Sequence, residues 1–345
     1  NHVAFSTFWN VMKKFVLYFI LMSLFLPLSA ENKAILVGIS DYPPESGWSK
    51  LSSVRDVNEI RKHLGPSFDV KTLVDNEATY DNIVYLLDKT VTEAQIGDTV
   101  YIHFSCHGQQ MISSDQFEVD YLDEALIPYD AISRKTSVYN GEKHLKDDVV
   151  SLFVQKLRIK VGTNGLVIIT LDSCHSDSMD RDSNTEDDDC IYRGGLPIFG
   201  AEQLVPDSLI SIKNKWRAKQ PSSLESDTLA HVLYLSACNS YERNKEIIVD
   251  SVGYGSLSHA ISKAFEEYDF SNLYAWRKAI LDKMKKDVPF QSPQTRSSLS
   301  FETKEVAESP IMISEADNSN ITFIVVGVIL IILLFVLWIM KKVKK

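Results

Sequence analysis

His107 and Cys174 combine the chemistry of a base and a nucleophile, and each follows a short, strongly apolar run of the sequence. Residues 99–104 form the run before His107, and residues 166–171 form the run before Cys174. A thiol attacks a carbonyl group as its thiolate, and a nearby imidazole promotes this ionisation and later protonates the leaving amine. Brought together, the two side chains would form the catalytic pair of a cysteine peptidase.

Gly108 directly follows His107 and adds a third candidate group. Its backbone N–H, unobstructed by a side chain, can approach the oxyanion that develops when a carbonyl is attacked. The backbone N–H of Cys174 would be the second donor. A lone buried cysteine is usually a packing residue, and a lone histidine at a strand end is often structural. It is the pair, each member just past an apolar run, that favours catalysis.

The apolar runs alternate with segments of helical periodicity along the middle of the chain. The expected strands are residues 34–39, 68–73, 99–104, 166–171 and 231–236, and the expected helices are residues 54–64, 80–92, 148–159, 257–267 and 273–286. This alternation predicts an α/β fold with a mainly parallel, doubly wound sheet. Sites in such sheets form at the carboxyl ends of the strands, so neighbouring parallel strands would bring both candidate residues to one edge.

The sequence around both candidate residues resembles the caspase-like peptidases. Residues 105–108 (SCHG) resemble the family segment S-G-H-G, and residues 172–176 (DSCHS) resemble the segment D-x-C-H-S-G of the metacaspase branch. Further resembling segments follow the family's order: residues 34–43, 54–57, 123–130 and 235–239, with Gly255. The resemblance covers about residues 33–295. It implies a three-layer caspase-like fold with a mainly parallel central sheet and a His107/Cys174 dyad.

Two positions depart from the family pattern. Cys106 stands where the family has a glycine before the histidine, and Asp177 stands where it has a glycine after C-H-S. A charged side chain near the nucleophile can constrain its loop or change the pKa of the thiol. These departures leave the family resemblance intact and bear on activity.

The resemblance also implies a pocket for the substrate residue that precedes the cut bond. In metacaspases a carboxylate two residues before the nucleophile lines this pocket, which corresponds to Asp172, and Asp56 matches a second such acid. Two carboxylates in a closed pocket favour Lys or Arg, because a buried charge needs an opposite partner. The alternatives are a structural cap for Asp172 and a helix-start residue for Asp56. Arg55, beside Asp56, could neutralise it.

Some metacaspases need calcium, which carboxylates from several loops hold. Asp123, Asp147, Asp148 and Asp180 lie near the matching places, and oxygen-rich clusters suit this hard cation. The alternative is a set of exposed loop acids. The chemistry of a His/Cys dyad itself requires no cofactor, so calcium is expected only as an activator.

Composition narrows the class of protein further. The 345 residues are 45% hydrophobic and 24% charged, which is ordinary for a globular protein, and the net charge of -10 disfavours a nucleic-acid partner. The four cysteines include no C-x-x-C pair, which argues against a zinc ribbon or a thioredoxin-like site. The sequence leaves open whether one or two disulfide bridges form.

Two further apolar segments predict membrane targeting. Residues 15–28 follow Lys13 and Lys14 and end in small residues, which is typical of a signal peptide cleaved after Ala30; an uncleaved anchor is the alternative. Residues 321–340 carry no charge and are long enough to span a bilayer as a transmembrane helix, with a buried core helix as the alternative. The lysines in residues 341–345 predict a cytoplasmic tail.

These features predict five parts: residues 1–30, a signal peptide with upstream residues; 31–296, the peptidase domain; 297–320, a polar tether; 321–340, the membrane helix; and 341–345, the tail. The expected protein is a single-pass membrane protein with an extracytoplasmic peptidase domain that acts on proteins or peptides.

The favoured function is an endopeptidase that cuts after Lys or Arg. The alternatives are a weakly active or inactive caspase-like binding module, and an acyl transferase related to the GPI transamidase. The acidic loop at residues 177–195 joins the two halves of the domain and is expected to be open to cutting. We therefore expect self-processing at Arg181 or Arg193.

Overall fold

The computed structural model describes Lys14 and residues 32–112, 122–174, 190–194, 198–201, 228–239 and 242–299, and the statements below concern these residues. Apart from Lys14, the predicted signal peptide lies outside them, as do the membrane helix at residues 321–340 and the lysine tail. Asp177, Asp180 and Arg181 also lie outside them. No helix of the described part of the chain is long and apolar enough to cross a membrane.

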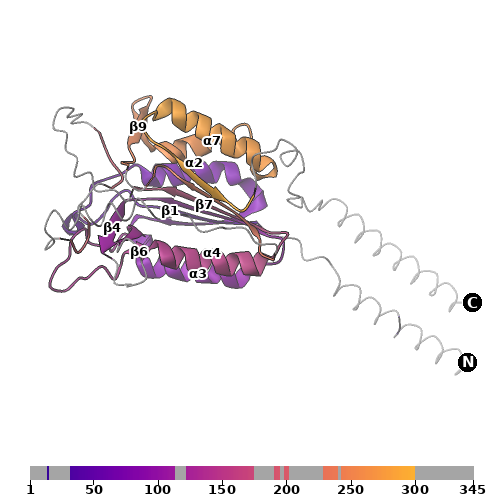
Figure 1. Cartoon of the computed structure of the whole chain (residues 1–345), viewed down its shortest axis with the longest axis horizontal. Coiled ribbons are helices and arrows are strands. Elements are labelled where there is room, and N and C mark those ends of the chain that lie inside the picture. Colours follow the sequence, from indigo (N-terminus) through magenta and orange to yellow (C-terminus); the bar gives the residue numbers. More distant parts are fainter. Residues whose placement is uncertain are drawn as a thin grey trace, which may run out of the picture. The chain divides into compact units, whose positions relative to one another are not determined.

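A six-stranded sheet forms the centre of the described fold, with the strand order β11-β8-β7-β3-β1-β2 (Figure 1). Its strands are β1 (Asn32–Gly38), β2 (Phe68–Val74), β3 (Thr99–Ser105), β7 (Leu166–Asp172), β8 (His231–Ser236) and β11 (Gln294–Ser297). Neighbours from β2 to β8 run parallel, and β11 is antiparallel to β8. The predicted α/β fold with a mainly parallel sheet is confirmed, and the antiparallel edge strand is an addition that the sequence pattern did not indicate.

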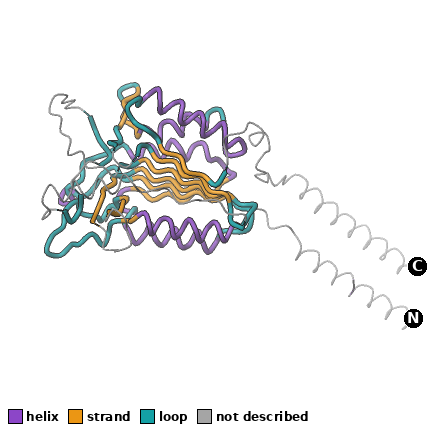
Figure 2. The backbone as a smooth tube through the Cα atoms, in the orientation of Figure 1, coloured by secondary structure: helices purple, strands orange, loops and turns teal. Residues whose placement is uncertain are grey.

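Helices cover both faces of this sheet (Figure 2). One face carries α2 (Ser53–Leu64), α6 (Ser256–Phe265) and α7 (Leu273–Asp287), and the other carries α3 (Tyr80–Glu93) and α4 (Asp147–Val161). Each face has its own apolar cluster, because successive strand residues point to opposite sides. In β1, Leu36 packs in the cluster of α2 and Val37 in the cluster of α3. Burial on both faces explains why the central strands read as continuous apolar runs.

Short elements complete the described part of the chain. Two small antiparallel sheets consist of β4 (Gly108–Ile112), β5 (Leu122–Leu126) and β6 (Leu145–Lys146), and of β9 (Glu246–Val249) and β10 (Val252–Gly255). Single 3₁₀ turns lie at Pro44–Ser46, Gly65–Ser67, Asp75–Glu77 and Phe270–Asn272. β4 starts directly after His107, so this small sheet leaves the main sheet at its carboxyl edge. Strands this short carry little periodicity, which is why the sequence did not indicate them.

Candidate active site

The register of β3 and β7 brings the two candidate catalytic residues to the same edge of the sheet. These strands are adjacent and parallel, and Ser105 pairs with Asp172 at their carboxyl ends. His107 and Cys174 each follow two residues later. Both residues therefore leave the main sheet at one edge, on loops from neighbouring strands, as the sequence predicts for a site of this kind.

The imidazole of His107 lies in an aromatic, buried setting. Its ring stacks on Trp48 with centroids 5.0 Å apart, lies 5.3 Å from the ring of Tyr42, and places Nε2 2.9 Å from the carbonyl oxygen of Ser49. A carbonyl only accepts hydrogen bonds, so Nε2 carries the hydrogen of the neutral ring and Nδ1 keeps a lone pair. Nδ1 has no hydrogen-bond partner among the described residues. Burial lowers the pKa of His107 to about 4, so at neutral pH the ring is an available proton acceptor.

The thiol of Cys174 is also buried, with 1% of the residue exposed. Its Sγ donates to the carbonyl oxygen of Glu242 at 2.6 Å, and the Sγ of Cys238 approaches the same oxygen at 3.6 Å. The hydrogen bond with Cys174 and burial raise the pKa of Cys238 well above its usual range. None of the four cysteines forms a disulfide bridge, which settles the possibility that the sequence left open.

Two backbone N–H groups converge on one oxygen beside these residues. The N–H of Cys174 donates to the carbonyl oxygen of Arg193 at 2.9 Å, and the N–H of Gly108 donates to the same oxygen at 3.3 Å. They are the donors that the sequence suggests for an oxyanion. A carbonyl oxygen of the chain itself is thus held by both candidate donors.

The side chain of Arg193 is fully buried among three carboxylates, which we call the acid pocket: Asp56, Asp172 and Glu246. Its Nη2 lies 2.6 Å from Asp56 Oδ2 and 2.7 Å from Glu246 Oε1. Its Nη1 lies 3.8 Å from Asp172 Oδ2 and 2.5 Å from the hydroxyl of Ser105. The pocket therefore binds a guanidinium group on both of its terminal nitrogens.

Neighbouring donors hold the acid pocket in place. Asp172 Oδ2 accepts hydrogen bonds from the backbone N–H (2.7 Å) and hydroxyl (2.6 Å) of Ser258, and its Oδ1 accepts from the side-chain amide of Asn244 at 2.6 Å. Glu246 accepts from the N–H of Ser52 at 2.7 Å and from its hydroxyl at 2.9 Å. These bonds orient two of the carboxylates through groups other than Arg193, which is how a preorganised binding pocket is supported.

Burial and neighbouring charges shift the pKa values of the side chains in the acid pocket. Burial raises the pKa of Asp56 to about 7, against the lowering effect of Arg193 and with the raising effect of Asp172. Burial also raises the pKa of Asp172, but Arg193 and the bonds from Ser258 and Asn244 outweigh it and hold that pKa below its usual range. The carboxylates raise the pKa of Arg193 despite its burial. Without a cation, the pocket would hold closely spaced acids that repel each other, so it favours a positively charged occupant.

The backbone around Arg193, here called the inserted segment (residues 190–194), lies along one side of the site as an added strand. The N–H of Arg193 donates to the carbonyl of Asn244 at 2.9 Å, and the N–H of Glu246 donates to the carbonyl of Ile191 at 2.9 Å. Tyr192 forms an antiparallel bridge with Lys245 between them. This pairing is the way in which an extended peptide binds to a free strand edge.

The structure corrects one expectation about the acid pocket and adds a residue to it. Arg55 does not neutralise Asp56: its Nη1 donates to the carbonyl of Gly253 at 2.8 Å, and its guanidinium lies 5.6 Å from the ring centroid of Tyr254. Glu246, the first residue of β9, was missed by sequence reasoning. No local motif distinguishes this glutamate from the other acids of the chain, because the partners that define its role are distant in sequence.

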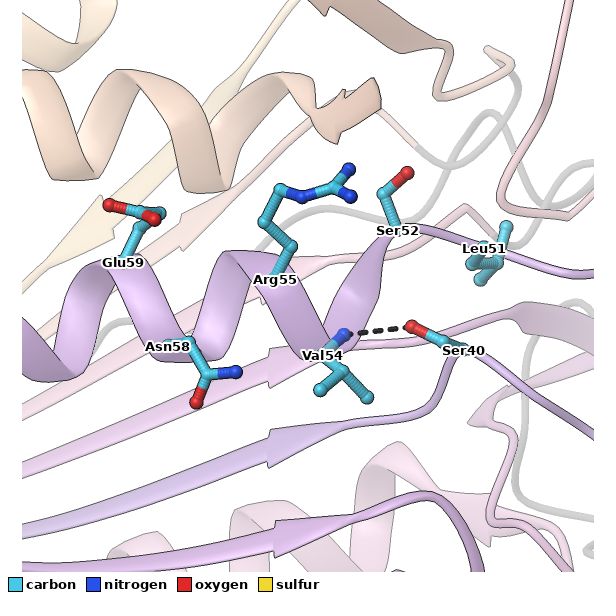
Figure 3. A pocket seen from close by; sticks show the side chains of 7 residues that line it. All are labelled: Ser40, Leu51, Ser52, Val54, Arg55, Asn58 and Glu59. Atoms are coloured by element: carbon cyan, nitrogen blue, oxygen red, sulfur yellow. Dashed lines mark hydrogen bonds between the residues drawn. The ribbon is translucent and has the colours of Figure 1, made fainter. Parts of the chain in front are cut away.

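Arg55 instead lines a surface pocket of about 430 Å³ at the start of α2 (Figure 3). Its lining residues are Ser40, Leu51, Ser52, Val54, Arg55, Asn58 and Glu59. The N–H of Val54 donates to the hydroxyl of Ser40 at 2.9 Å and ties the start of the helix to the end of β1. Ser52 faces both regions, since it also bonds to Glu246, so this pocket adjoins the outer wall of the acid pocket.

The carboxylates suggested for calcium do not form a cation site among the described residues. Asp123 is buried, and its Oδ2 pairs with the ammonium group of Lys146 at 2.5 Å. Asp147 and Asp148 lie in the first turn of α4, and Asp180 lies outside the described residues. In the part of the chain that the structure describes, no group of three or more His, Cys, Asp or Glu side chains is placed to hold a metal ion.

Cys106, which stands where the family has a glycine, is buried in the apolar core. The residue is 1% exposed and packs in the apolar cluster on the α3 side of the sheet. Burial raises the pKa of its thiol to about 12, so it stays neutral. The second departure, Asp177, lies outside the described residues.

Comparison with known proteins identifies the family. The chain matches the model of the caspase-domain peptidases, family C14, over residues 31–308, and it belongs to this family. Its fold is that of the caspase-like α/β proteins, with a mixed sheet that is mostly parallel. A crystal structure of a Geobacter sulfurreducens protein has a similar fold, with a TM-score of 0.54 and 19% identity, covering 78% of this chain and 94% of that one.

Fungal metacaspases are among the relatives. Metacaspase-1 of Mycosarcoma maydis is 23% identical over 299 residues, which cover 79% of this chain and 71% of the relative. Metacaspase-1 of Pyricularia oryzae is 29% identical over 160 residues, 43% of this chain and 37% of the relative. Metacaspase-1A of Aspergillus clavatus is 28% identical over 162 residues, 44% of this chain and 34% of the relative. The last two matches thus span little more than a third of each fungal protein.

Proposed function

We propose that this chain is a cysteine endopeptidase that hydrolyses peptide bonds after Arg, and after Lys less efficiently. Cys174 is the proposed nucleophile, His107 the base, and the N–H groups of Gly108 and Cys174 the donors for the oxyanion. Asp56, Asp172 and Glu246 would bind the side chain before the cut bond. Membership of the caspase-domain family and similarity to metacaspases support a peptidase.

The reaction would proceed through a covalent intermediate. Nδ1 of His107 takes the proton of the Cys174 thiol, and the thiolate attacks the carbonyl carbon of the bound arginine. The two N–H groups stabilise the negative charge that develops on the carbonyl oxygen. The imidazolium then protonates the leaving amine, and water, activated by the same ring, hydrolyses the thioester.

One observation carries the proposal: the chain's own Arg193 occupies the site in the way expected for a substrate. Its carbonyl oxygen receives both N–H groups, its guanidinium lies in the acid pocket, and its backbone pairs with Asn244. A merely structural arginine would need the ion pairs alone. The carbonyl contact, made together with the ion pairs, supports a site built to hold an arginine next to a reactive thiol.

The test is hydrolysis of matched peptides that differ only in the residue before the cut. We expect kcat/KM to fall in the order Arg, Lys, Ala, Asp, because only the first two are cations and only Arg can contact both sides of the pocket. Cys174→Ala and His107→Ala should each abolish hydrolysis of all four peptides. A preference for Asp, or activity that survives Cys174→Ala, would contradict the proposal.

The alternative of an inactive binding module has one observation in its favour: the inserted segment fills the site and leaves Cys174 1% exposed. A closed site also fits an inactive precursor, and the intact dyad and paired N–H groups favour that interpretation. Acyl transfer of the GPI-transamidase kind has less support, because the fungal relatives named above are metacaspases. A binding module would bind arginine peptides without cutting them under any condition.

Calcium remains a prediction from the sequence. Of the carboxylates that the structure describes, Asp123 pairs with Lys146, and no described group of three or more His, Cys, Asp or Glu side chains is placed to hold a metal ion. We derive no step of the reaction from the cation. The check is the rate of Arg-peptide hydrolysis in EGTA and in millimolar calcium: an unchanged rate removes the activator role, and a large increase requires ligands beyond the described residues.

Membrane attachment is likewise a proposal that rests on the sequence. Residues 15–28 have the character of a signal peptide, and residues 321–340 form a charge-free run followed by lysines. We propose a single-pass protein with its peptidase domain on the extracytoplasmic side and its lysine tail in the cytoplasm.

A further inference from the structure

The residue before Arg193 has a specific neighbour in the site. Tyr192 is half-buried, and the guanidinium carbon of Arg243 lies 4.7 Å from the centroid of its ring. Successive side chains of an extended chain point to opposite sides, so Tyr192 projects away from the acid pocket that holds Arg193. The bridge between Tyr192 and Lys245 fixes the backbone at this position. A second side-chain subsite therefore lies beside the first, with Arg243 as its covering residue.

The chemistry of this subsite favours an aromatic ring. A guanidinium group over an aromatic face is attracted by the ring quadrupole, and the planar group also makes close contact with the ring. Arg243 is exposed, so the attraction is of the size found at solvent-accessible sites. A lysine at the same substrate position would meet the like charge of Arg243 and be disfavoured.

The residue after Arg193 meets a different restriction. Gly194 has φ +153°, and a Cβ atom built on it would lie 2.2 Å from the carbonyl oxygen of Cys174 and 3.0 Å from that of Gly108. Both neighbours are backbone atoms. They cannot easily move, because the N–H groups of these same two residues hold the carbonyl of Arg193. In this binding mode only glycine fits directly after the arginine.

From these contacts we infer that the site reads three consecutive substrate residues: an aromatic residue, arginine and glycine, with the bond between arginine and glycine cut. Arg243 is the specificity-determining residue for the aromatic position. The backbone of Cys174 and Gly108 sets the glycine position. This inference rests on the proposed function and narrows its substrate class.

The test uses peptides based on residues 191–196 (IYRGGL). The tyrosine is replaced by Phe, Ala or Lys in one series, and the glycine after the arginine is replaced by Ala in another. We expect kcat/KM for the Tyr and Phe peptides to exceed that of the Ala peptide by about two- to fivefold, with Lys below Ala. We expect the Arg-Gly peptide to exceed the Arg-Ala peptide by about tenfold.

Protein variants assign these preferences to residues. Arg243→Met keeps most of the apolar stem of the side chain and removes the charge, so the ratio of Tyr to Ala peptides should fall to about one. Arg296→Met is the matched control. Arg296 lies on β11, outside the site, with its guanidinium carbon 5.9 Å from the ring centroid of Tyr234 on β8, and its loss should leave the ratio unchanged. A Tyr-to-Ala ratio near one in the unaltered protein, or one that survives Arg243→Met, overturns the role of Arg243. Equal cutting of Arg-Gly and Arg-Ala overturns the glycine restriction.

A binding measurement separates this inference from the proposed function. In a Cys174→Ala, Arg193→Ala double variant the nucleophile is absent and the pocket is free of its own arginine. Fluorescence anisotropy of the labelled peptides should give the same order of affinity as the rates. If no peptide is ever hydrolysed but the Tyr-Arg-Gly peptide binds best, the preference for the three residues stands, and the cut between arginine and glycine fails together with the peptidase proposal. If the peptides bind without preference, the inference fails whatever the rates.

Discussion

The three carboxylates of the acid pocket differ in how closely they contact the guanidinium of Arg193, and the order is not the one that the sequence suggests. The resemblance gives Asp172 the main role, yet its carboxylate lies 3.8 Å from Arg193, whereas Asp56 and Glu246 approach within 2.6 and 2.7 Å. Asp172 is engaged by Ser258 and Asn244 instead. Its charge acts on the guanidinium over a longer distance, and the direct contacts come from the other two acids.

The first prediction concerns these direct contacts. Glu246→Gln and Asp56→Asn keep the shape of the pocket and remove a charge-assisted hydrogen bond, so each should lower kcat/KM on Arg peptides by roughly 10- to 100-fold. Asp172→Asn should also lower it, because it removes a nearby negative charge. The measurement is kcat/KM on matched Arg and Ala peptides.

A control tests whether such losses reflect binding of the cation. The same variants should change hydrolysis of the Ala peptide far less, since alanine does not reach the carboxylates. Glu59→Gln, an exchange on the outer side of α2 within the surface pocket, should leave both rates unchanged. Equal losses on Arg and Ala peptides would show that the three acids support the fold and not the specificity.

At the level of elements, the inserted segment combines two properties. It pairs as a strand with residues 244–246, and it places the carbonyl of Arg193 on the two candidate oxyanion donors and its guanidinium in the acid pocket. The sequence suggested cutting in this region from the acidic character of residues 177–195 and from its arginines. The structure favours Arg193 as the position, because its carbonyl contacts both candidate oxyanion donors.

The second prediction is self-processing between Arg193 and Gly194. The purified chain should yield two fragments whose new ends, read by mass spectrometry, fall at this bond. Cys174→Ala should suppress the cut, and Arg193→Ala should move or abolish it. Tyr192→Ala serves as a weaker variant that slows the cut through the neighbouring subsite. Unchanged processing in the Cys174→Ala chain would point to another protease.

At the level of the whole molecule, three buried histidines couple stability to pH. Burial lowers the pKa of His103, His107 and His144 to about 4, from an ordinary value of 6.5. As the pH falls, these histidines therefore take up protons at a higher pH in the unfolded chain than in the folded chain. The stability that these neutral side chains contribute is fully present above pH 6.5 and is lost as the pH falls towards 4. Asp56, whose pKa is raised, acts in the opposite direction.

The third prediction follows from this coupling. The unfolding midpoint Tm should fall between pH 6.5 and pH 4, and His144→Gln should make that fall shallower. His144 is suited to the exchange because it lies between Tyr139 and Gln109, away from the acid pocket. Thermal unfolding followed by circular dichroism at several pH values checks it. An equal pH slope in the variant and the unaltered chain would contradict the account.

The fourth prediction concerns orientation in the membrane. If the proposed topology is right, a protease added outside intact cells or spheroplasts should remove the peptidase domain. It should leave a small membrane-embedded fragment ending in the lysine tail of residues 341–345. Detergent-treated cells provide the control, because the added protease then reaches the domain on either side of the membrane. Complete protection of the domain in intact cells would reverse the proposed orientation.

The sequence by itself determined the parallel strands and the helices of the main layers, and it indicated the candidate reactive positions. Apolar runs buried on both faces gave the central strands, and the residues after two of them indicated His107 and Cys174. These signals are local: a strand's burial pattern and a short motif lie within ten residues of each other.

The tertiary structure alone decided how the acid pocket is assembled and what fills it. Glu246, Ser52 and Asn244 come from distant parts of the chain, and no periodicity or motif connects them before folding. The sequence could not show that Arg55 turns to Gly253, nor that Arg193 enters the pocket. Each outcome depends on which buried charges meet, and a buried charge is stable only with a partner that folding brings from elsewhere.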